Sequence, residues 1–419
     1  MHRNALLSVL ACLVMTVSGP IAASSAADIG TDLLADPSVK RAIEFAERNE
    51  AAVLEDQVRV CEVAAPPFKE TARGQLVRGL FESLGLRAVR VDAVGNVIGE
   101  RPGRAASPNL VFSAHLDTVF PEGTNVRVTR EGSVLRGPGI GDDCRGLAVV
   151  LGVIRALNAA RVETPGTITF VGTVGEEGLG DLRGVKHLFE KELKGRIDAF
   201  VSVDGAGVGI THVGVGSHRY RVTISGPGGH SYGAFGMANP IHALGRAIAA
   251  IAEFQMPTSP KTTFNVGRIG GGTSVNSIAF EAWMEVDMRS SDADALGEVD
   301  AKFQHAVDAA VAAENARWGK RGAVSAKKEL VGHRAAGRTP RNAPIVQAAV
   351  SVTQALGLAI SLDEGSTDSN VAMGLGVPAV TIDGGGSGRG AHSLQESFDA
   401  TDSWKGTARA ALLAVALAR

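Results

Sequence analysis

The segment Thr167–Gly178, TITFVGTVGEEG, restricts the possible folds of this chain more than any other stretch. Its first half is an apolar run with the β-branched residues of a buried strand, and its second half is a glycine-rich turn with adjacent carboxylates, Glu176 and Glu177. Two carboxylates side by side near a core repel each other, so one of them takes up a proton or a cation sits between them. The segment therefore predicts a strand that delivers acidic groups to a polar site.

Other polar groups along the chain follow apolar runs or glycine-rich turns in the same way. His115 comes directly after the run Asn109–Ala114, Asp142 lies in a glycine-rich turn, Asp204 ends a further apolar run, and His392 lies near the C-terminus. Imidazole nitrogens and carboxylate oxygens in this number suit a pair of divalent metal ions, each held by one nitrogen and several oxygens. The pattern indicates a two-metal hydrolytic site.

Composition narrows the class of partner. The chain has 419 residues and a formal net charge of -2, and no run of lysines and arginines forms a basic patch. Nucleic acid is therefore not an expected partner. The length is enough for two domains, each with its own core.

Residues 1–26 have the parts of an export signal. His2 and Arg3 precede the apolar run Ala5–Val17, and small residues at 22–27 supply cleavage sites. The run is too short to span a bilayer, so we expect an exported chain, periplasmic or secreted, with no membrane attachment once the signal is removed. A buried N-terminal helix and a lipoprotein anchor through Cys12 are weaker alternatives.

Two cysteines remain after signal removal, Cys61 and Cys144. In an exported chain they either pair or stay free, and their spacing does not decide between the two. Cys144 directly follows Asp142 and Asp143, so as a free residue it is either a thiol beside the predicted site or an inert packing residue.

Helical and strand patterns alternate over most of the chain, which predicts an α/β fold with helices on both faces of a sheet. Residues 213–331 differ: they predict helices on one face of an antiparallel sheet, a domain inserted into the first. The predicted catalytic domain is thus 27–212 and 332–419.

The predicted helices are Val39–Ala52, Glu70–Leu84, Arg145–Ala160, Asp181–Leu193, Pro240–Phe254, Asp294–Arg317, Ala343–Leu356 and Asp402–Ala418. The predicted strands are Arg87–Gly99, Asn109–Ala114, Gly166–Val174, Ala199–Asp204, Ser217–Ser225, Thr262–Ile269, Ile278–Ser290, Ala323–Val331 and Ala379–Asp383.

Seven short motifs occur in one order, and the match that they define covers nearly the whole mature chain. Together they resemble the co-catalytic zinc peptidase family that includes glutamate carboxypeptidase, tripeptide aminopeptidase, succinyl-diaminopimelate desuccinylase and aminoacylase. The resemblance implies a mixed-sheet α/β/α catalytic domain with an inserted α+β, ferredoxin-like lid and dimerisation domain. The motifs are SAHLDTV at Ser113–Val119, GPGIGDDCRG at Gly137–Gly146, GTVGEEG at Gly172–Gly178, SVDG at Ser202–Gly205, GPGGHS at Gly226–Ser231, GGTSVNSI at Gly271–Ile278 and AHSLQE at Ala391–Glu396.

The resemblance also assigns roles around two divalent ions, with Zn²⁺ expected and Co²⁺ or Mn²⁺ as alternatives. His115 would bind one metal and His392 the other, with Asp142 bridging them; Glu177 would join one metal and Asp204 the other. Asp143 is the alternative bridge but is expected to support the backbone. Glu176 would be the general base, and Asp117 would fix the tautomer of His115 from two residues along the strand.

The inserted domain would act as a lid and form a possible homodimer. His230 would stabilise the oxyanion, from the partner subunit in dimeric members of the family. Asn276 and Arg289 are predicted to bind a substrate carboxylate, a group that a guanidinium fork suits. Thr367 and Asn370 are predicted to line the substrate side near His392.

The expected substrate is a short peptide, cleaved in the manner of an aminopeptidase or dipeptidase. Asp204, where carboxypeptidases and deacylases of the family more often carry glutamate, and the STDSN segment at 366–370 favour that branch. Removal of the acyl group from an N-acyl amino acid, or carboxypeptidase action, is the alternative. A hypothesis of another class is an exported peptide-binding protein without turnover.

Overall fold

The computed structural model describes residues 26–419. The predicted export signal therefore lies outside the described residues, except for Ala26, which begins a helix. Among the helices of residues 26–419, none combines the length and the apolar character needed to cross a membrane.

A mixed β-sheet forms the centre of the larger part of the molecule. Its strands are β1 (Arg87–Val91), β2 (Val97–Arg101), β3 (Asn109–His115), β6 (Thr167–Thr173), β7 (Ala199–Val203), β8 (Gly209–Gly214), β15 (Gly337–Arg338), β16 (Ser361–Gly365) and β17 (Ala379–Ile382). They lie in the order β1-β2-β6-β3-β7-β17-β8-β15, with β16 also beside β8. The neighbours β6, β3, β7 and β17 run parallel, so their carboxyl ends meet at one edge of the sheet.

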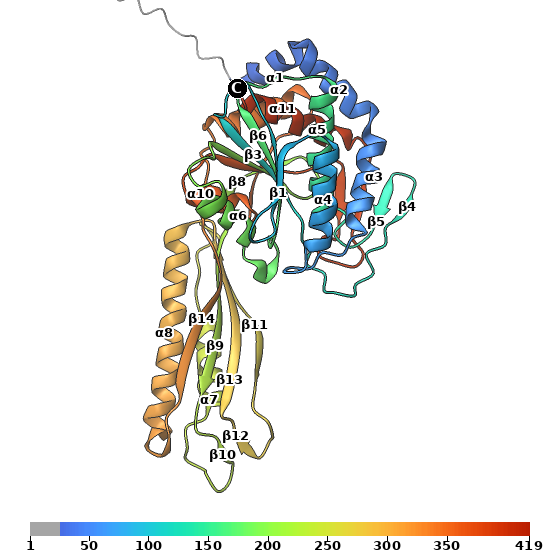
Figure 1. The fold of residues 1–419 in the computed structure, drawn as a ribbon. Helices are drawn as coiled ribbons and strands as arrows, with labels where there is room; N and C mark the ends of the chain where they lie inside the picture. Colours follow the sequence, from blue (N-terminus) through green and yellow to red (C-terminus); the bar gives the residue numbers. More distant parts are fainter. Residues whose placement is uncertain (1–25) are drawn as a thin grey trace, which may run out of the picture.

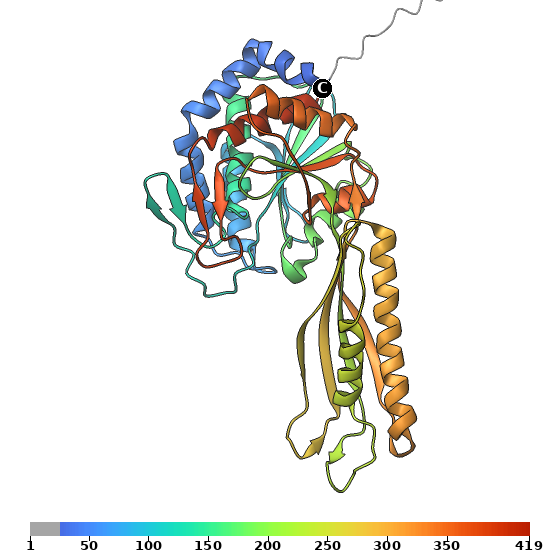
Figure 2. The same cartoon turned by 180° about the vertical axis from the view of Figure 1, so that it is seen from behind.

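Helices cover both faces of this sheet, as the alternating pattern predicted (Figures 1 and 2). In β3, Leu110 and Phe112 pack in the core of one face and Val111 in the core of the other, the period of two that a buried strand requires. The helices of the first face are α1 (Ala26–Ala35), α2 (Pro37–Arg48), α3 (Glu50–Cys61), α4 (Thr71–Ser83), α5 (Cys144–Ala159), α9 (Pro344–Ala355) and α11 (Trp404–Leu417); those of the second are α6 (Arg183–His187), the π-helical η2 (Leu188–Glu192) and α10 (Ser369–Gly374).

The inserted domain is a long arm that extends away from the catalytic domain (Figures 1 and 2). Its elements are β9 (Gly216–Ser225), α7 (Pro240–Ala252), β11 (Thr262–Gly271), β13 (Glu281–Ser290), α8 (Ala293–Trp318) and β14 (Ser325–Arg334). The four strands form an antiparallel sheet in the order β11-β13-β9-β14, with both helices packed against it. This βαββαβ arrangement with its own apolar core has the ferredoxin-like order that was predicted for the inserted domain, which we call the lid.

The boundaries of the lid differ slightly from the prediction. The chain enters the lid between the end of β8 at Gly214 and the start of β9 at Gly216, and it leaves between the end of β14 at Arg334 and the start of β15. The predicted limits, 213 and 331, fall inside β8 and β14. The predicted strand ends at Val331, but β14 continues to Arg334 through a shift of register between Leu330 and Gly332.

A small antiparallel sheet, which the sequence analysis missed, links two loops of the site. Its strands are β4 (Thr129–Glu131), β5 (Val134–Arg136), β18 (Ser387–Arg389) and β19 (Ser397–Asp399), in the order β18-β19-β5-β4. The pairing of β5 with β19 brings the loop that carries Asp142 beside the loop that carries His392. The predicted helix Val39–Ala52 is also two helices, because α2 ends at Arg48 and α3 begins at Glu50.

Candidate functional site

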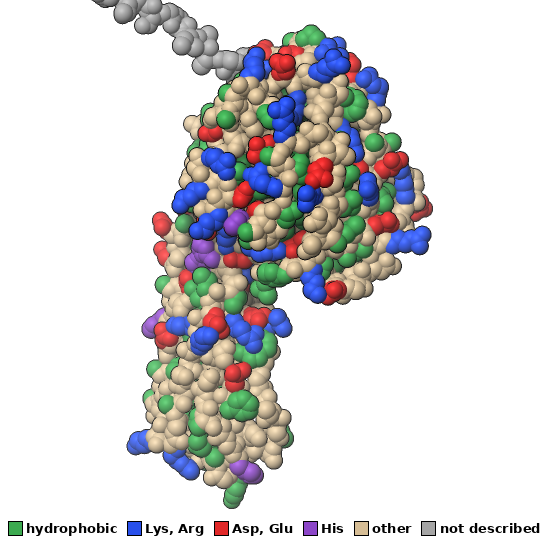
Figure 3. Space-filling model, in the orientation of Figure 1, with side chains coloured by type: hydrophobic (Ala, Val, Ile, Leu, Met, Phe, Trp, Pro, Cys, Tyr) green, Lys and Arg blue, Asp and Glu red, His purple; other side chains and the backbone are tan. Residues whose placement is uncertain are grey.

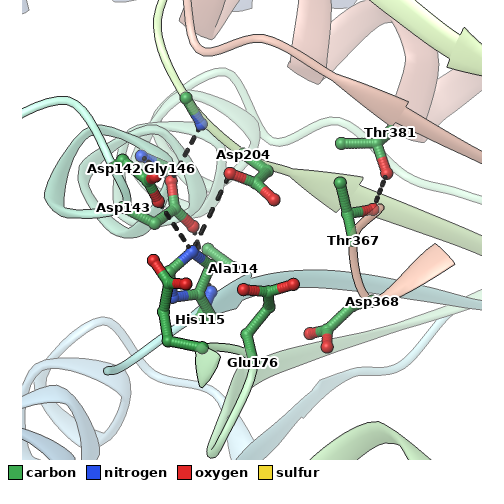
Figure 4. Close-up of polar contacts among 12 residues, drawn as sticks. Ala114, His115, Asp142, Asp143, Gly146, Glu176, Asp204, Thr367, Asp368 and Thr381 are labelled. Carbon is green, nitrogen blue, oxygen red and sulfur yellow. Dashed lines mark hydrogen bonds and ion pairs between the residues drawn. The ribbon is translucent and has the colours of Figure 1, made fainter. Parts of the chain in front are cut away.

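Three neighbouring parallel strands deliver polar side chains to one edge of the large sheet (Figure 4). His115 is the last residue of β3, Asp204 follows β7 directly, and Glu176 and Glu177 lie in the turn after β6. Asp142 comes from the loop before α5. Side chains that are far apart in the sequence therefore meet at the carboxyl ends of β3, β6 and β7, as the sequence predicted.

His115 lies at the centre of the first group of candidate metal ligands. Its Nε2 is 3.0 Å from Asp142 Oδ1 and 3.8 Å from Asp204 Oδ1. His115 is 1% exposed, whereas the two aspartates are partly exposed. One imidazole nitrogen and two carboxylate oxygens thus converge at a point that opens toward solvent.

His392 lies at the centre of a second group. Its Nε2 is 3.0 Å from the other oxygen of the same aspartate, Asp142 Oδ2, and 3.1 Å from Glu177 Oε1. The two oxygens of Asp142 therefore lie against two different imidazoles.

The backbone of His392 has φ of 65°, in the left-handed region that few non-glycine residues adopt, and this conformation costs about 1–3 kcal/mol.

The donor chemistry of these groups fits a pair of divalent ions. The carboxylates of Asp142 and Glu177 raise the pKa of His392 to about 10 through hydrogen bonds. Burial lowers the pKa of His115, but the surrounding aspartates outweigh burial and raise it well above its usual range. Carboxylates that hold protons on two imidazoles in this way form a strongly cation-attracting site. Nitrogen and oxygen ligands in two triads joined by one carboxylate are a donor set that zinc, cobalt or manganese accepts.

Asp143 supports the metal loop from inside the fold. Its buried carboxylate accepts hydrogen bonds from the backbone N–H of His115 and of Gly146, both at 3.0 Å, and it caps the start of α5. These contacts confirm the prediction that Asp143 supports the backbone.

Asp117 acts differently from the prediction. The Nδ1 of His115 lies 3.0 Å from the backbone carbonyl oxygen of Asp117, while the carboxylate of Asp117 is 3.8 Å away. The carboxylate instead accepts hydrogen bonds from the backbone N–H of Glu176 at 3.0 Å and of Glu177 at 2.8 Å. The carbonyl holds the ring of His115, and the side chain of Asp117 fixes the turn that carries the two glutamates.

Glu176 is buried and paired with an arginine that the sequence analysis did not single out. Arg334, at the end of β14, donates to Glu176 Oε1 at 2.9 Å and also to the backbone carbonyl of Glu176. Burial raises the pKa of Glu176 well above its usual range, and the positive charge of Arg334 opposes that rise. No motif surrounds Arg334 in the sequence, and its partner is 158 residues away, so only the fold reveals the pair.

A cavity of about 430 Å³ lies beside the two histidine groups. Two of the predicted substrate-binding residues, Arg289 and Thr367, line it, together with Arg219 and Arg334. Arg289 donates through Nε to Asp287 at 2.7 Å, and Thr367 shares a hydrogen bond with Thr381 (Figure 4). The cavity is lined by Val119, Asp142, Glu176, Glu177, Gly178, Asp204, Thr211, Arg219, Arg289, Arg334, Ser366, Thr367, Thr381, Asp383 and His392.

Asn370 does not face this cavity, contrary to the prediction. It is 1% exposed, and its amide nitrogen donates to the backbone carbonyls of Val215 at 3.0 Å and Ala335 at 2.9 Å. Its amide oxygen accepts from the backbone N–H of Thr367. Because both donors and the acceptor are engaged inside the fold, Asn370 is a structural residue that joins the two segments connecting the lid.

His230 and Asn276 lie together, but far from the two histidine groups. His230 belongs to β10 (Gly229–His230), which pairs with β12 (Ser277–Ile278) directly after Asn276. Figure 1 shows β10 and β12 at the end of the lid that points away from the catalytic domain. His230 is exposed, and its Nδ1 accepts from the backbone N–H of Tyr232 at 3.2 Å. Within one chain, these two predicted site residues are therefore not at the site.

Cys61 and Cys144 form a disulfide bond between the end of α3 and the start of α5. Both residues are fully buried. This bond decides the question that the spacing of the cysteines left open.

Comparisons with known proteins agree with the geometry of the site. The model of peptidase family M20/M25/M40 matches residues 111–416. Among similar sequences, the YqjE protein of Bacillus subtilis is 25% identical over 350 residues, which are 80% of this chain and 90% of that protein. A succinyl-diaminopimelate desuccinylase of Nitrosospira multiformis is 28% identical over 275 residues, 60% of this chain and 71% of the desuccinylase.

Solved structures share the fold at lower identity. A tripeptidase from Staphylococcus aureus superimposes with a TM-score of 0.71 at 22% identity, over 88% of this chain and 99% of that one. A dinuclear metal-binding peptidase from Bacillus subtilis superimposes with a TM-score of 0.64 at 19% identity, over 89% and 98%. The chain therefore belongs to peptidase family M20/M25/M40 and is a metal-dependent hydrolase of peptide or acyl-amino acid amide bonds.

Proposed function

We propose that this enzyme hydrolyses the amide bonds of short peptides, as an aminopeptidase or dipeptidase does. The observation that carries the proposal is the position of Asp142, whose two carboxylate oxygens each lie 3.0 Å from a different imidazole nitrogen. A single carboxylate shared in this way can bridge two ions held by the groups on either side.

His115, Asp142 and Asp204 would hold one ion, and Asp142, Glu177 and His392 the other. Zinc is the proposed metal, with cobalt or manganese as alternatives, because the donors are nitrogen and oxygen only. When bound, a pair of divalent ions supplies Lewis acidity that makes water a nucleophile near neutral pH and polarises an amide carbonyl.

Glu176 is the proposed general base. Its carboxylate would take the proton of the attacking water and then deliver that proton to the leaving amine, a contribution of about 10²–10⁴ in rate. Burial raises the pKa of Glu176, which favours proton uptake, while Arg334 holds the carboxylate in place. The base is thus fixed by an arginine from the end of the lid that adjoins the catalytic domain.

The charges around the cavity favour a short peptide over an N-acyl amino acid. Arg289 uses only Nε within the described chain, so its terminal nitrogens are free to bind a substrate carboxylate. Asp383 also lines the cavity, and burial raises its pKa to about 6, so this carboxylate is still ionised near neutral pH. A short peptide has a carboxylate for Arg289 and an ammonium group for Asp383, whereas an N-acyl amino acid has only the carboxylate.

A panel of substrates tests this proposal. Dipeptides and tripeptides are assayed beside N-acyl amino acids and amidated peptides, with added zinc, cobalt or manganese. We expect peptides with both free ends to be cleaved fastest, and Arg289→Ala to raise KM for free-acid peptides but not for amidated ones. Arg268→Ala, an exposed arginine on β11 outside the cavity, is the control. Faster cleavage of N-acyl amino acids would favour the deacylase, and binding without turnover would favour a peptide-binding protein.

We also propose that a homodimer completes the site. Nδ1 of His230 accepts backbone N–H groups, so in the neutral ring Nε2 carries the proton and is a ready donor to an oxyanion. Large apolar side chains, Tyr232, Phe235, Val275 and Phe280, are exposed in the same part of the lid, where Figure 3 shows hydrophobic side chains on the surface. An apolar lid end that carries a proton donor suits contact with a second copy.

Export from the cytoplasm is proposed as the location. The pattern of residues 1–26 supports it, and so does the Cys61–Cys144 bond, because structural disulfides form and persist in oxidising compartments. Mass spectrometry of the mature chain from the producing cell would give the cleavage point, and a full-length chain in the cytoplasm would contradict export.

A further inference from the structure

The Cys61–Cys144 bond lies directly behind the proposed bridging ligand. Cys144 is the first residue of α5, and Asp142 is two residues before it. The bond links this point to the end of α3, across a sequence separation of 83 residues. The bond belongs to a small apolar core whose other buried members are Leu54, Leu135, Ile140 and Phe398.

The loop before α5 is held by side chains from two other segments. In the first, the carboxylate of Glu396 accepts from the backbone N–H of Gly139 and Gly141 at 2.8 Å each, and from that of Asp142 at 3.0 Å. The second is α3, where the side-chain amide of Gln57 donates to the carbonyl of Ile140 at 2.7 Å. Besides the disulfide and the Gln57 bond, α3 is linked to the start of α5 by hydrogen bonds that Arg145 Nη1 donates to Glu50 at 3.2 Å and to Gln57 at 3.4 Å.

We propose that Cys61 and Cys144 are a positioning pair for the metal centre, an inference that rests on the proposed metal ligands. The covalent bond fixes the start of α5, and with it Asp142, at the point where its two oxygens face His115 and His392. A ligand that serves two ions must be held within about 0.5 Å of its working position. Because Asp142 belongs to both groups, loosening it weakens both metal sites together.

The bond makes metal retention depend on the redox state of the chain. Reduction by a phosphine consumes one water: the phosphine takes the oxygen, and the two sulfurs keep the two protons as thiols. The sulfurs are fully buried, so reagent reaches them only when this part of the fold opens. An enzyme that folds where disulfides form holds its metals more tightly than the same chain folded with free thiols.

The test compares metal affinity with stability. The double variant Cys61→Ala, Cys144→Ala is loaded with zinc and titrated with a chelator, and bound zinc is counted at a temperature where circular dichroism shows the folded state. We expect zinc affinity about 10- to 100-fold lower than in the parent, the range found when groups that orient ligands are removed. The matched control is Leu33→Ala, which removes a fully buried side chain from α1, away from the loop. It should lower Tm while leaving zinc affinity unchanged.

The outcomes separate this inference from the proposed function. A parent that binds fewer than about two zinc ions per chain would overturn the proposed metal centre itself. A parent that binds two ions, with a double variant that retains them equally well, would overturn only the role of the disulfide. If the double variant does not fold, the same titration is run on parent enzyme that has been reduced with phosphine and freed of reagent without oxygen. Thiol counting must first show that the bond is open. If the zinc affinity of the reduced enzyme is then unchanged, the inference is rejected.

Discussion

The carboxyl edge of the large sheet and the far end of the lid hold two sets of side chains that were predicted to serve one reaction. At the sheet edge, His115, Asp142, Glu177 and His392 come within hydrogen-bonding distance in groups that share Asp142. At the far end of the lid, where Figure 1 shows β10, the exposed His230 lies away from these groups.

The difference shows what determines each arrangement. Parallel strands in one sheet end at a common edge, so the first set converges through local strand geometry within a single chain. The second set can reach a site only if the far end of the lid contacts a catalytic domain. That domain belongs either to the same chain, after a movement of the lid, or to a second copy. Substitutions in the first set should therefore change metal content or the chemical step within one chain, whereas substitutions in the second set should lower kcat without loss of metal.

Loss of the shared ligand should have the largest effect. Asp142→Ala removes an oxygen donor from both groups, so we expect metal content well below two ions per chain and a fall in kcat of more than about 10⁴, beyond the loss of a general base alone. Metal analysis after dialysis and peptide hydrolysis measure both effects. Full metal occupancy in Asp142→Ala would assign the bridge to Asp143 instead.

Removal of the base should separate metal binding from catalysis. Glu176→Gln keeps the size of the side chain, so we expect both metals to remain while kcat falls about 10²–10⁴-fold. Glu190→Gln, in η2, is the control and should behave as the parent. Activity that survives in Glu176→Gln would remove this residue from the role of base.

His230→Ala should lower kcat without disturbing the metal ligands at the sheet edge. We expect metal content and Tm to stay the same while kcat falls about 10²–10³-fold, the cost of one lost oxyanion donor. The control is His242→Ala, an exposed histidine on α7.

Mixing two inactive variants tests whether His230 serves the site of a second chain. In a mixed dimer of Asp142→Ala and His230→Ala, one site has intact ligands from one chain and an intact histidine from the other. When equal amounts of the two variants exchange subunits, about half of all dimers are mixed, and one of the two sites in each mixed dimer is complete. About a quarter of parental activity should therefore return. If no activity returns although subunits exchange, the lid closes within its own chain.

Asp368→Asn should have the smallest effect, on stability. Burial raises the pKa of Asp368 from 3.8 to about 6, so ionisation opposes folding. The penalty is absent below the unfolded pKa and complete above the folded pKa, so this group lowers the free energy of unfolding by about 2–3 kcal/mol as pH rises from 4 to 7. Urea unfolding of the chelator-treated enzyme should show Asp368→Asn gaining that amount relative to the parent over this range. A constant difference between the two proteins at pH 4 and pH 7 would contradict the shift.

Sequence patterns predicted the elements whose signal is local. The apolar run of β3 and the apolar spacing of α5 and α8 predicted their positions to within one or two residues. His115, Asp142, Glu177 and Asp204 were predicted as metal ligands because each one follows an apolar run or lies in a glycine-rich turn. His392 was marked only by the motif AHSLQE. What the sequence could not give depends on contacts between distant segments.

Two residues show why. Arg334 reaches Glu176 only because β14 ends beside the turn after β6, and nothing around Arg334 in the sequence marks that contact. Asn370 lies in a polar segment next to the site, yet its side chain turns inward to carbonyls at positions 215 and 335. Position near a motif does not determine the direction of a side chain.

The attachment of the lid has a mechanical consequence. The chain passes between the two domains at residues 215 and 335, and the amide of Asn370 holds both crossings. The strands β9, β13 and β14 are each 10 residues long, so the lid reaches about 33 Å beyond this point. A rotation of about 10° at the crossings moves the outer end by about 6 Å, as a lever arm of that length requires. The buried amide of Asn370 ties the two crossings together, so a small change of angle there would move the other end of the molecule by about the length of a side chain.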